Sequence, residues 1–259
     1  MSTPATAWTI DLNADLGEGF GAWASPADSE LFTLISSASI ACGFHAGDPT
    51  RMRETATLAA QSGVVVGAHP GYPDLLGFGR RELGASAREV ADYVAYQVGA
   101  MIACAAAART RVRYVKPHGA LYNRGAREPE IARAIAEGVR AADTDLALLG
   151  LAGSALLTAA REAGIQPVAE AFLDRGYRED GSLVPRGHPG ALIEDPAVAA
   201  ARAVRLVRQG VVETVDGASI AVSAESLCVH GDGTRASAVL RAVRERFAAE
   251  GIAVAPFAR

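Results

Sequence analysis

The order of its apolar and helical segments is the feature that most constrains the fold of this chain. Seven short apolar stretches, each typical of a buried strand, alternate with polar loops and longer helical stretches. They are Trp8–Ala14, Ser37–Ala41, Val64–Ala68, Arg113–Lys116, Leu146–Leu149, Pro167–Ala171 and Ser226–Val229. Since neighbouring parallel strands need a crossover connection, this alternation predicts a parallel sheet. We therefore expect an α/β fold, a seven-stranded TIM-like β/α barrel in one domain over residues 1–259, with a doubly wound open sheet as the alternative.

Capping signals mark the ends of several expected helices. Polar residues that can cap a helix start stand before proline, or three residues before a glutamate, in four places. They are Ser25 before Pro26, Asp48 before Pro49, Ser86 before Glu89, and Asp195 before Pro196. Gly63 and Gly164 are placed to end helices in a left-handed conformation. Near 211–222, Asp216-Gly217 between two short apolar runs predicts a small inserted β-hairpin with a type I′ turn.

Composition excludes several classes of partner. The net charge is -4 and the pI is about 5.8, so no broad basic surface is available for nucleic acid or an anionic membrane. The longest apolar run, Val98 to Ala108, is much shorter than the roughly 20 residues that span a bilayer. An odd number of cysteines, widely spaced, argues against a disulfide framework, and the N-terminus lacks the pattern of an export signal. We expect a cytoplasmic protein.

Lys116 is the only lysine in a chain with 24 arginines. It ends a short apolar strand that runs into the turn His118-Gly119. An arginine stays protonated at any working pH, whereas the pKa of a lysine falls readily on burial, so the two are not interchangeable at a reacting centre. We interpret Lys116 as a candidate catalytic residue, against the alternative of a stray lysine in an arginine-biased chain.

Polar residues gather after the predicted strands. In a parallel barrel these positions converge on one face, where side chains at the strand ends meet. The residues at these positions are Asn13, Asp15, Glu18, His45, His69, Lys116, His118, Asn123, Glu170, Asp174, Arg175, His230 and Asp232. Period two places Asp11, Asn13 and Asp15 on one face of the first strand, which would bring carboxylates into the barrel mouth. Asp15 is the best acid or base candidate, with Asn13 and Glu18 as orienting groups.

The histidine set has two interpretations. Asp15, His45, His69 and His118 could bind a divalent metal, because neutral imidazole and carboxylate suit zinc or a similar ion. No HxH or HExxH spacing fixes two ligands on one element, so the same residues could instead bind a small polar substrate and move protons. Arg186 offers a guanidinium suited to a carboxylate or phosphate. The cysteines lack a local base and are left out of the catalytic set.

Five strings, in order along the chain, closely resemble motifs of the LamB/YcsF family. They are the segments 11–21 (DLNADLGEGFG), 39–49 (SIACGFHAGDP), 67–74 (GAHPGYPD), 115–123 (VKPHGALYN) and 228–232 (CVHGD). The resemblance implies a seven-stranded β/α barrel similar to that of polysaccharide deacetylases. It also implies ATP-dependent 5-oxoprolinase activity, the opening of the lactam 5-oxoproline to L-glutamate, together with two partner subunits, B and C. One departure is Ala14, where many relatives are expected to have cysteine.

The implied reaction suggests roles for the candidate residues. Asp15 would act as base, His118 or Lys116 as acid, and Lys116 would also stabilise developing oxyanion charge. The substrate-binding candidates are Asn13, Glu18, His45, His69, Asn123, Asp174, Arg186, His230 and Asp232. No Walker A motif is present, so ATP is expected as co-substrate of an activation step that depends on the partner subunits. Two alternatives stay open: a stand-alone metal-dependent amidohydrolase or deacetylase, and a non-catalytic lactam-binding subunit.

Overall fold

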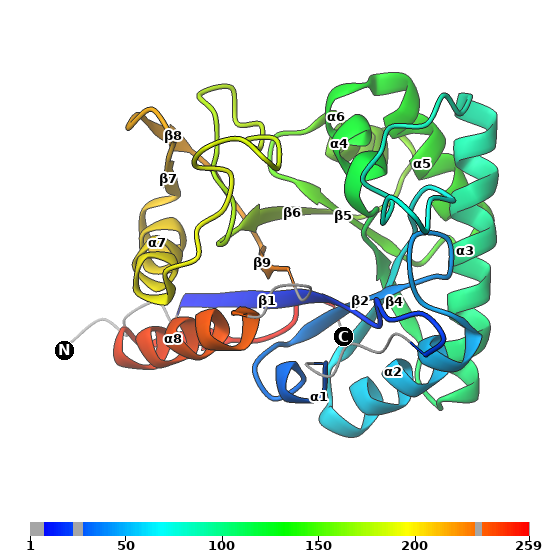
Figure 1. Cartoon of the computed structure of the whole chain (residues 1–259), viewed down its shortest axis with the longest axis horizontal. Helices are drawn as coiled ribbons and strands as arrows, with labels where there is room; N and C mark the ends of the chain where they lie inside the picture. The colour runs from blue at the N-terminus through cyan, green and yellow to red at the C-terminus, as the bar shows by residue number, and fades with distance from the viewer. Residues whose placement is uncertain (1–7, 23–27, 231–234, 259) are drawn as a thin grey trace.

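The computed structural model describes residues 8–22, 28–230 and 235–258. Within these ranges, seven parallel strands form a closed barrel (Figure 1). The strands follow the order β1-β2-β3-β4-β5-β6-β9, and β1 pairs with both β2 and β9. This double pairing closes the sheet, so the barrel prediction is confirmed and the open-sheet alternative is wrong.

The seven barrel strands coincide with the seven predicted stretches to within two residues at each end. They are β1 (Trp8–Leu16), β2 (Ser37–Ala41), β3 (Val65–His69), β4 (Val112–Val115), β5 (Ala147–Leu151), β6 (Pro167–Phe172) and β9 (Ser226–Val229). An eighth strand, β10 (Ile252–Val254), was not predicted. It pairs in parallel with the first residues of β1, outside the closed ring.

Helices surround the barrel on its outer side (Figure 1). They are α1 (Asp28–Leu31), α2 (Pro49–Ser62), α3 (Ala87–Ala107), α4 (Gly119–Arg127), α5 (Pro129–Ala142), α6 (Ala155–Glu162), α7 (Pro196–Gln209) and α8 (Ala236–Ala249). Their buried residues are mostly Ala, Val, Leu and Ile, which allows the helices to pack closely on the strands. The apolar core therefore lies between the ring of helices and the outer face of the barrel.

The capping predictions hold for α2, α3 and α7. Asp48 accepts hydrogen bonds from the backbone N–H groups of Thr50 and Arg51, and Asp195 caps α7 in the same way. Ser86 and Glu89 form a reciprocal capping box at the start of α3. Gly63 and Gly164 have positive φ, as expected at helix ends. The predicted start at Ser25 lies outside the described residues.

The predicted hairpin is present, but its turn type was wrong. The strands β7 (Val211–Glu213) and β8 (Ser219–Ala221) pair antiparallel beside α7 (Figure 1). Gly217 has φ of 82°, while Asp216 does not have the positive φ that a type I′ turn requires. The N–H of Gly217 donates to the carbonyl of Thr214, and the N–H of Thr214 donates to the carbonyl of Ala218. This pattern is a type I turn followed by a glycine bulge, which fits a longer loop.

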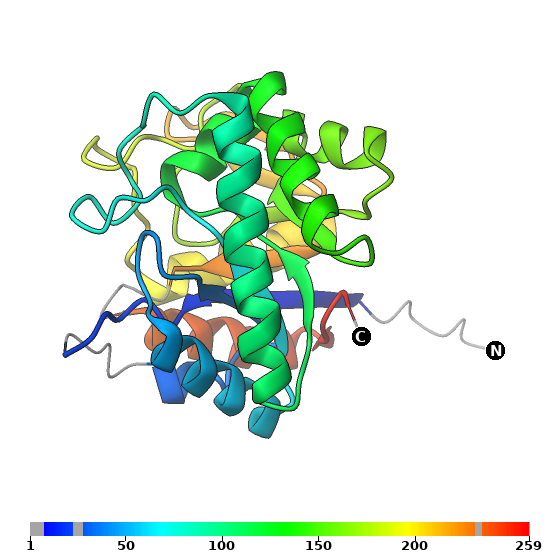
Figure 2. The same ribbon diagram turned by 90° about the vertical axis from the view of Figure 1, so that its right-hand side faces the viewer.

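Helix α3 is long and apolar enough, by length and composition, to cross a membrane. In the barrel, however, it runs along α5 and covers β3 and β4 (Figure 2). Its buried stripe includes Gln97, whose side chain bonds to both the N–H and the carbonyl of Gly71. The apolar composition of α3 is therefore explained by its packing against the barrel.

The barrel interior is divided into an aromatic and apolar base and a polar mouth. At the base, Tyr114 packs edge-on against Phe257, and its ring lies above Gly67, where a Cβ would come within 2.2 Å of it. Only glycine fits this position of β3. Toward the carboxyl ends of the strands the lining becomes polar, and this end carries the residues that the sequence singled out.

Candidate active site

The inward face of β1 carries a row of buried polar groups. Asp11, Asn13 and Asp15 are each less than 5% exposed, and they alternate with the apolar residues that pack outward. Asp11 accepts hydrogen bonds from the hydroxyls of Ser36, Ser37 and Ser226. The Asp11 carboxyl group, the deepest of the three polar groups, thus accepts three hydrogen bonds. The predicted alternation is therefore confirmed, and it places the polar face in the lumen.

Lys116 lies at the centre of this lumen and is 1% exposed. Its ammonium nitrogen is 2.9 Å from Asp15 Oδ1 and 2.9 Å from Glu170 Oε1. It also donates to Asn13 Oδ1 at 3.1 Å and lies 3.1 Å from Cys228 Sγ. The only lysine of the chain thus bridges β1, β6 and β9 through its side chain.

Charge, rather than burial, decides the protonation of Lys116. Burial alone would lower its pKa, as expected from the sequence, but the Asp15 and Glu170 carboxylates outweigh burial and raise that pKa well above its ordinary value. Burial would likewise raise the pKa of Asp15, but neighbouring positive charge, including the Lys116 ammonium, lowers it. Both groups are therefore ionised at neutral pH, and Lys116 is a cation in this lumen.

Glu170 and Tyr122 complete this network; the sequence had placed Glu170 among the polar residues at the strand ends but had given neither residue a role. Glu170 accepts hydrogen bonds from Asn13 Nδ2 and from the Tyr122 hydroxyl, both at 2.8 Å. It is fully buried. The signal that could have identified it is a lone acidic residue in the apolar strand β6, on the same period-two face as Phe172.

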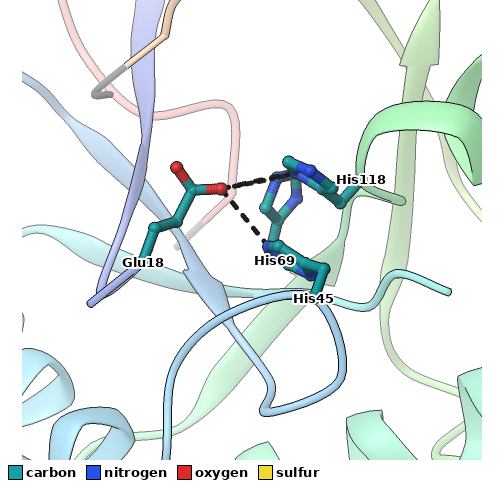
Figure 3. Close-up of side chains that lie close together, drawn as sticks. All are labelled: Glu18, His45, His69 and His118. Atoms are coloured by element: carbon teal, nitrogen blue, oxygen red, sulfur yellow. Dashed lines mark hydrogen bonds and ion pairs between the residues drawn. The ribbon is translucent and has the colours of Figure 1, made fainter. Parts of the chain in front are cut away.

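A second cluster joins three histidines and Glu18 (Figure 3). His45 follows β2, His69 ends β3 and His118 follows β4, and all three are buried. Glu18 Oε1 lies 3.3 Å from His45 Nε2, 4.0 Å from His69 Nε2 and 3.3 Å from His118 Nδ1. Figure 3 shows the carboxylate directed at the three rings. One ligand atom of each residue lies within 4.8 Å of all the others.

The backbone fixes the tautomers of two of these rings. His69 Nδ1 lies 2.7 Å from the carbonyl oxygen of Lys116, and His118 Nε2 lies 2.8 Å from that of Phe78. A carbonyl can only accept, so both of these nitrogens carry a proton. In the neutral rings, His69 Nε2 and His118 Nδ1 therefore carry no proton. The lone pairs of these two nitrogen atoms face each other, and the atoms are 2.9 Å apart. Such a contact requires a proton or a metal cation between the two atoms.

Burial disfavours the proton. It lowers the pKa of His69 to about 3 and holds the pKa of His45 and of His118 well below the usual range. The rings are therefore neutral near pH 7, which is the form that binds metals. In the predicted metal set the histidines come together, and the carboxylate nearest all three is Glu18. Asp15 is 3.5 Å from His69 Nε2 and bonds to Lys116 instead.

Glycines allow the histidine rings to come this close. The rings of His45 and His118 stack in parallel with centroids 3.7 Å apart. A Cβ at Gly79, which has φ of 64°, would lie 2.6 Å from His45 Cβ. A Cβ at Gly71 would lie 2.6 Å from His45 Nδ1. Larger residues at these two positions would displace the His45 ring.

Both clusters open into one cavity of about 380 Å³. Asp15, His69, Lys116 and His118 line its floor, and its other lining residues include four arginines, Asn123 and His230. His230 Nδ1 lies 2.9 Å from Asp174 Oδ2, and its ring stacks on Phe172. Burial would raise the pKa of Asp174, but His230 outweighs burial and lowers it. Asp232, the last candidate, lies outside the described residues.

The buried cysteines are unsuited to nucleophilic attack. Burial raises the pKa of Cys42 to about 12 and that of Cys228 well above the usual range, despite the neighbouring Lys116. A thiol that keeps its proton is a weak nucleophile. Leaving both residues out of the catalytic set agrees with this environment.

Comparison with known proteins gives similarity along nearly the whole chain. The chain is 53% identical over 249 residues to the protein of Streptomyces avermitilis named as the A subunit of 5-oxoprolinase, covering 96% of this chain and 100% of the relative. The crystal structure of the lactam utilization protein from Thermus thermophilus is 49% identical, covers 96% of this chain and 100% of its own, and superposes with a TM-score of 0.91. A T48 deacetylase, 12% identical over 98% of this chain and 90% of its own, with a TM-score of 0.50, shares the fold alone. The LamB/YcsF family model matches residues 10–259, and the chain belongs to the LamB/YcsF family.

Proposed function

We propose that this chain is the A subunit of an ATP-dependent 5-oxoprolinase, which opens 5-oxo-L-proline to L-glutamate. The observation that carries this proposal is the similarity, over 96% of the chain at about half identity, to relatives named as the A subunit of 5-oxoprolinase. The charged, buried site at the barrel mouth supports it, because a small polar lactam suits a cavity of about 380 Å³ with ionised groups on its floor.

The chemistry explains the need for ATP. A five-membered lactam is a poor electrophile, and transfer of a phosphoryl group to its carbonyl oxygen makes the ring carbon reactive. The remaining work is to direct water onto that carbon, to stabilise the negative charge that develops, and to protonate the leaving nitrogen. These tasks require a base, a fixed cation and an acid.

The residues on the cavity floor match these three tasks. Asp15 is ionised and can accept a proton from water. Lys116 stays cationic and would stabilise oxyanion charge, and its raised pKa makes it a poor proton donor. His118 is neutral and its Nδ1 faces His69 Nε2, so that atom has no proton to donate, and the leaving nitrogen would take its proton from Asp15 after that group has accepted one from water.

We place the phosphorylation step with partner subunits, B and C. The relatives are named as the A subunit of an enzyme, which implies further subunits. The sequence has no Walker A motif. The free cysteines among the described residues agree with a reducing compartment, and we propose a cytoplasmic location.

We also propose that Glu18, His45, His69 and His118 hold a divalent metal ion. This proposal is supported by the two unprotonated nitrogen atoms, His69 Nε2 and His118 Nδ1, which face each other at 2.9 Å beside the Glu18 carboxylate. A metal bound there would supply Lewis acidity toward a carbonyl oxygen. Three neutral imidazoles and one carboxylate suit zinc.

Calorimetric titration of zinc into the chelator-treated chain tests the metal site without any assay of activity. We expect one Zn²⁺ per chain, bound at least roughly tenfold more weakly by Glu18→Gln or His69→Asn. The matched control is His188→Asn, which removes an exposed histidine outside the cluster. Absence of zinc binding, or equal binding by Glu18→Gln, would contradict the site.

Reconstitution tests the proposed function itself. The purified chain is incubated with 5-oxoproline and ATP, with and without subunits B and C, and glutamate and ADP are measured together. We expect glutamate only in the complete mixture. Glutamate from this chain alone without ATP would instead establish a stand-alone metal-dependent amidohydrolase, the alternative that the histidine cluster favours.

A third possibility is a non-catalytic subunit that binds the lactam and delivers it. Substitution separates this possibility from catalysis. If the site is catalytic, Asp15→Asn lowers kcat in the complete mixture while the complex still assembles. A delivery role predicts a rise in KM with kcat preserved.

A further inference from the structure

Arginines line the wall of the active-site cavity above the floor. Arg80, Arg127, Arg175 and Arg186 all border it, whereas the acidic residues on its border are Asp15 and Glu82. Asp15 is already neutralised by Lys116. Glu82 forms an ion pair with Arg127. The wall formed by Arg175 and Arg186 is therefore left with an excess of positive charge.

Arg186 carries a donor that the protein does not satisfy. Its Nη2 atom is buried and finds no acceptor in the part of the chain that the structure describes. The residue stands between the main cavity and a neighbouring one of about 220 Å³ that also contains Asp174 and His230. A buried guanidinium nitrogen without an acceptor is costly, so a ligand that supplies one would bind favourably there.

Arg175 is fixed beside it. Its Nε donates to the carbonyl of Ala191 at 3.1 Å and its Nη2 to that of Val184 at 2.6 Å, so the side chain is held in place by backbone rather than by an anion. Burial, followed by repulsion from Arg186, lowers the pKa of Arg175 to about 10. Asp174 acts in the opposite direction on that pKa, but its oxygens bond to His230. Two guanidiniums thus line the same cavity and repel each other, and no carboxylate of the described residues is bonded to either.

We propose that Arg175 and Arg186 form a subsite for the phosphoryl group of an O-phosphorylated lactam. The inference rests on the proposed function, and it makes the activated lactam, rather than 5-oxoproline, the species that this chain binds productively. A phosphoryl group carries up to two negative charges and three acceptor oxygens, which two guanidiniums can share. A single carboxylate would neutralise only one of them.

A partner subunit transfers the γ-phosphoryl group of ATP to the lactam oxygen, which releases ADP and leaves a C–O–P linkage. Water adds to the ring carbon and loses its proton to Asp15, the C–N bond breaks, and the nitrogen takes up a proton as the amine. The product is a γ-acyl phosphate held by the two arginines. A second water then cleaves it to glutamate and inorganic phosphate.

Binding of inorganic phosphate to the isolated chain tests the subsite. Calorimetry is performed on the wild type and on Arg186→Gln, which removes the charge, and Arg186→Lys, which restores it. We expect Arg186→Gln to bind phosphate roughly tenfold or more weakly, with partial recovery in Arg186→Lys. Arg178→Gln is the control, because this arginine is exposed on the same segment and should leave phosphate binding unchanged.

A parallel titration with 5-oxoproline separates the two sources of negative charge. If Arg186→Gln weakens 5-oxoproline binding but not phosphate binding, the subsite holds the lactam carboxylate and the phosphoryl assignment is wrong. Equal phosphate binding by the wild type and Arg186→Gln also overturns the proposal, as does a wild type that binds no phosphate. Failure of the reconstituted mixture to form glutamate, with phosphate binding still dependent on Arg186, would instead refute the proposed function and retain an anion subsite.

Discussion

Replacing Lys116 by methionine tests whether the buried charge network has the role inferred here. Methionine is similar in length and unbranched, so Lys116→Met removes the charge with little change in volume. It leaves Asp15 and Glu170, each 2.9 Å from the lost nitrogen, facing a common space without a cation. It also removes a donor to Asn13.

The expected cost follows from these contacts. Removing one partner of a buried ion pair typically destabilises a protein by about 3–5 kcal/mol, and here two carboxylates lose the same partner. The pKa of Asp15 is lowered in the folded chain, so its stabilising contribution is present above the unfolded value and is lost as pH falls. The pKa of Lys116 is raised, so its contribution is fully present below 10.5. The deficit of Lys116→Met should therefore be complete from about pH 6 to 9 and shrink in acid, where Asp15 takes up a proton.

Urea unfolding followed by circular dichroism at pH 8 and pH 5 measures this deficit. We expect about 3–5 kcal/mol at pH 8 and less at pH 5. Arg113→Met on the outer side of the same strand is the control and should change the free energy of unfolding by no more than about 0.5 kcal/mol. A Lys116→Met variant as stable as the wild type at pH 8, or a deficit that grows in acid, would refute the reasoning.

Three further predictions use the same unfolding assay. Gly67→Ala should lower the free energy of unfolding by about 1–3 kcal/mol, because its Cβ would lie 2.2 Å from the Tyr114 ring. The control Gly99→Ala, which has open space around its Cβ in α3, should stabilise the chain. Equal effects of the two substitutions would contradict the packing argument. Asp48→Ala should cost about 1 kcal/mol through loss of the cap of α2, and no loss would show that the cap is replaced by water. Burial raises the pKa of Asp11 to about 6, so its ionisation should destabilise the wild type as pH rises from about 4 to 6. Asp11→Asn, which cannot ionise, should gain about 3 kcal/mol relative to the wild type between pH 4 and pH 7, and a pH-independent difference would contradict the raised pKa.

The fold was predictable because local signals agreed with one another. Each strand of the barrel is a short apolar run, and several helices start at a cap that the sequence identifies, such as Asp48 with Pro49. The turn of the hairpin was predicted wrongly because Asp-Gly suits both a type I′ turn and the second half of a type I turn with a bulge. Pairing of β10 with β1 depends on contacts between the two ends of the chain, which no local pattern specifies.

The candidate site was predictable as a set and not as a network. Period two and the strand ends brought Asp15, Lys116 and His118 together, since the barrel geometry fixes where strand ends meet. The partners within the set depend on side-chain direction. Glu18 rather than Asp15 joins the histidines, and Glu170 shares Lys116. The pKa of Lys116 is raised for the same reason, because the two flanking carboxylates come from strands far apart in sequence.

The most direct test of the central claim is the yield of glutamate from the complete mixture of this chain, subunits B and C, 5-oxoproline and ATP when Asp15→Asn replaces the wild type. If this chain performs ring opening, the variant should assemble with its partners and lose glutamate formation roughly 100-fold or more, through kcat. Glutamate formed at the wild-type kcat by the assembled variant would contradict the account and assign the ring-opening step to another subunit.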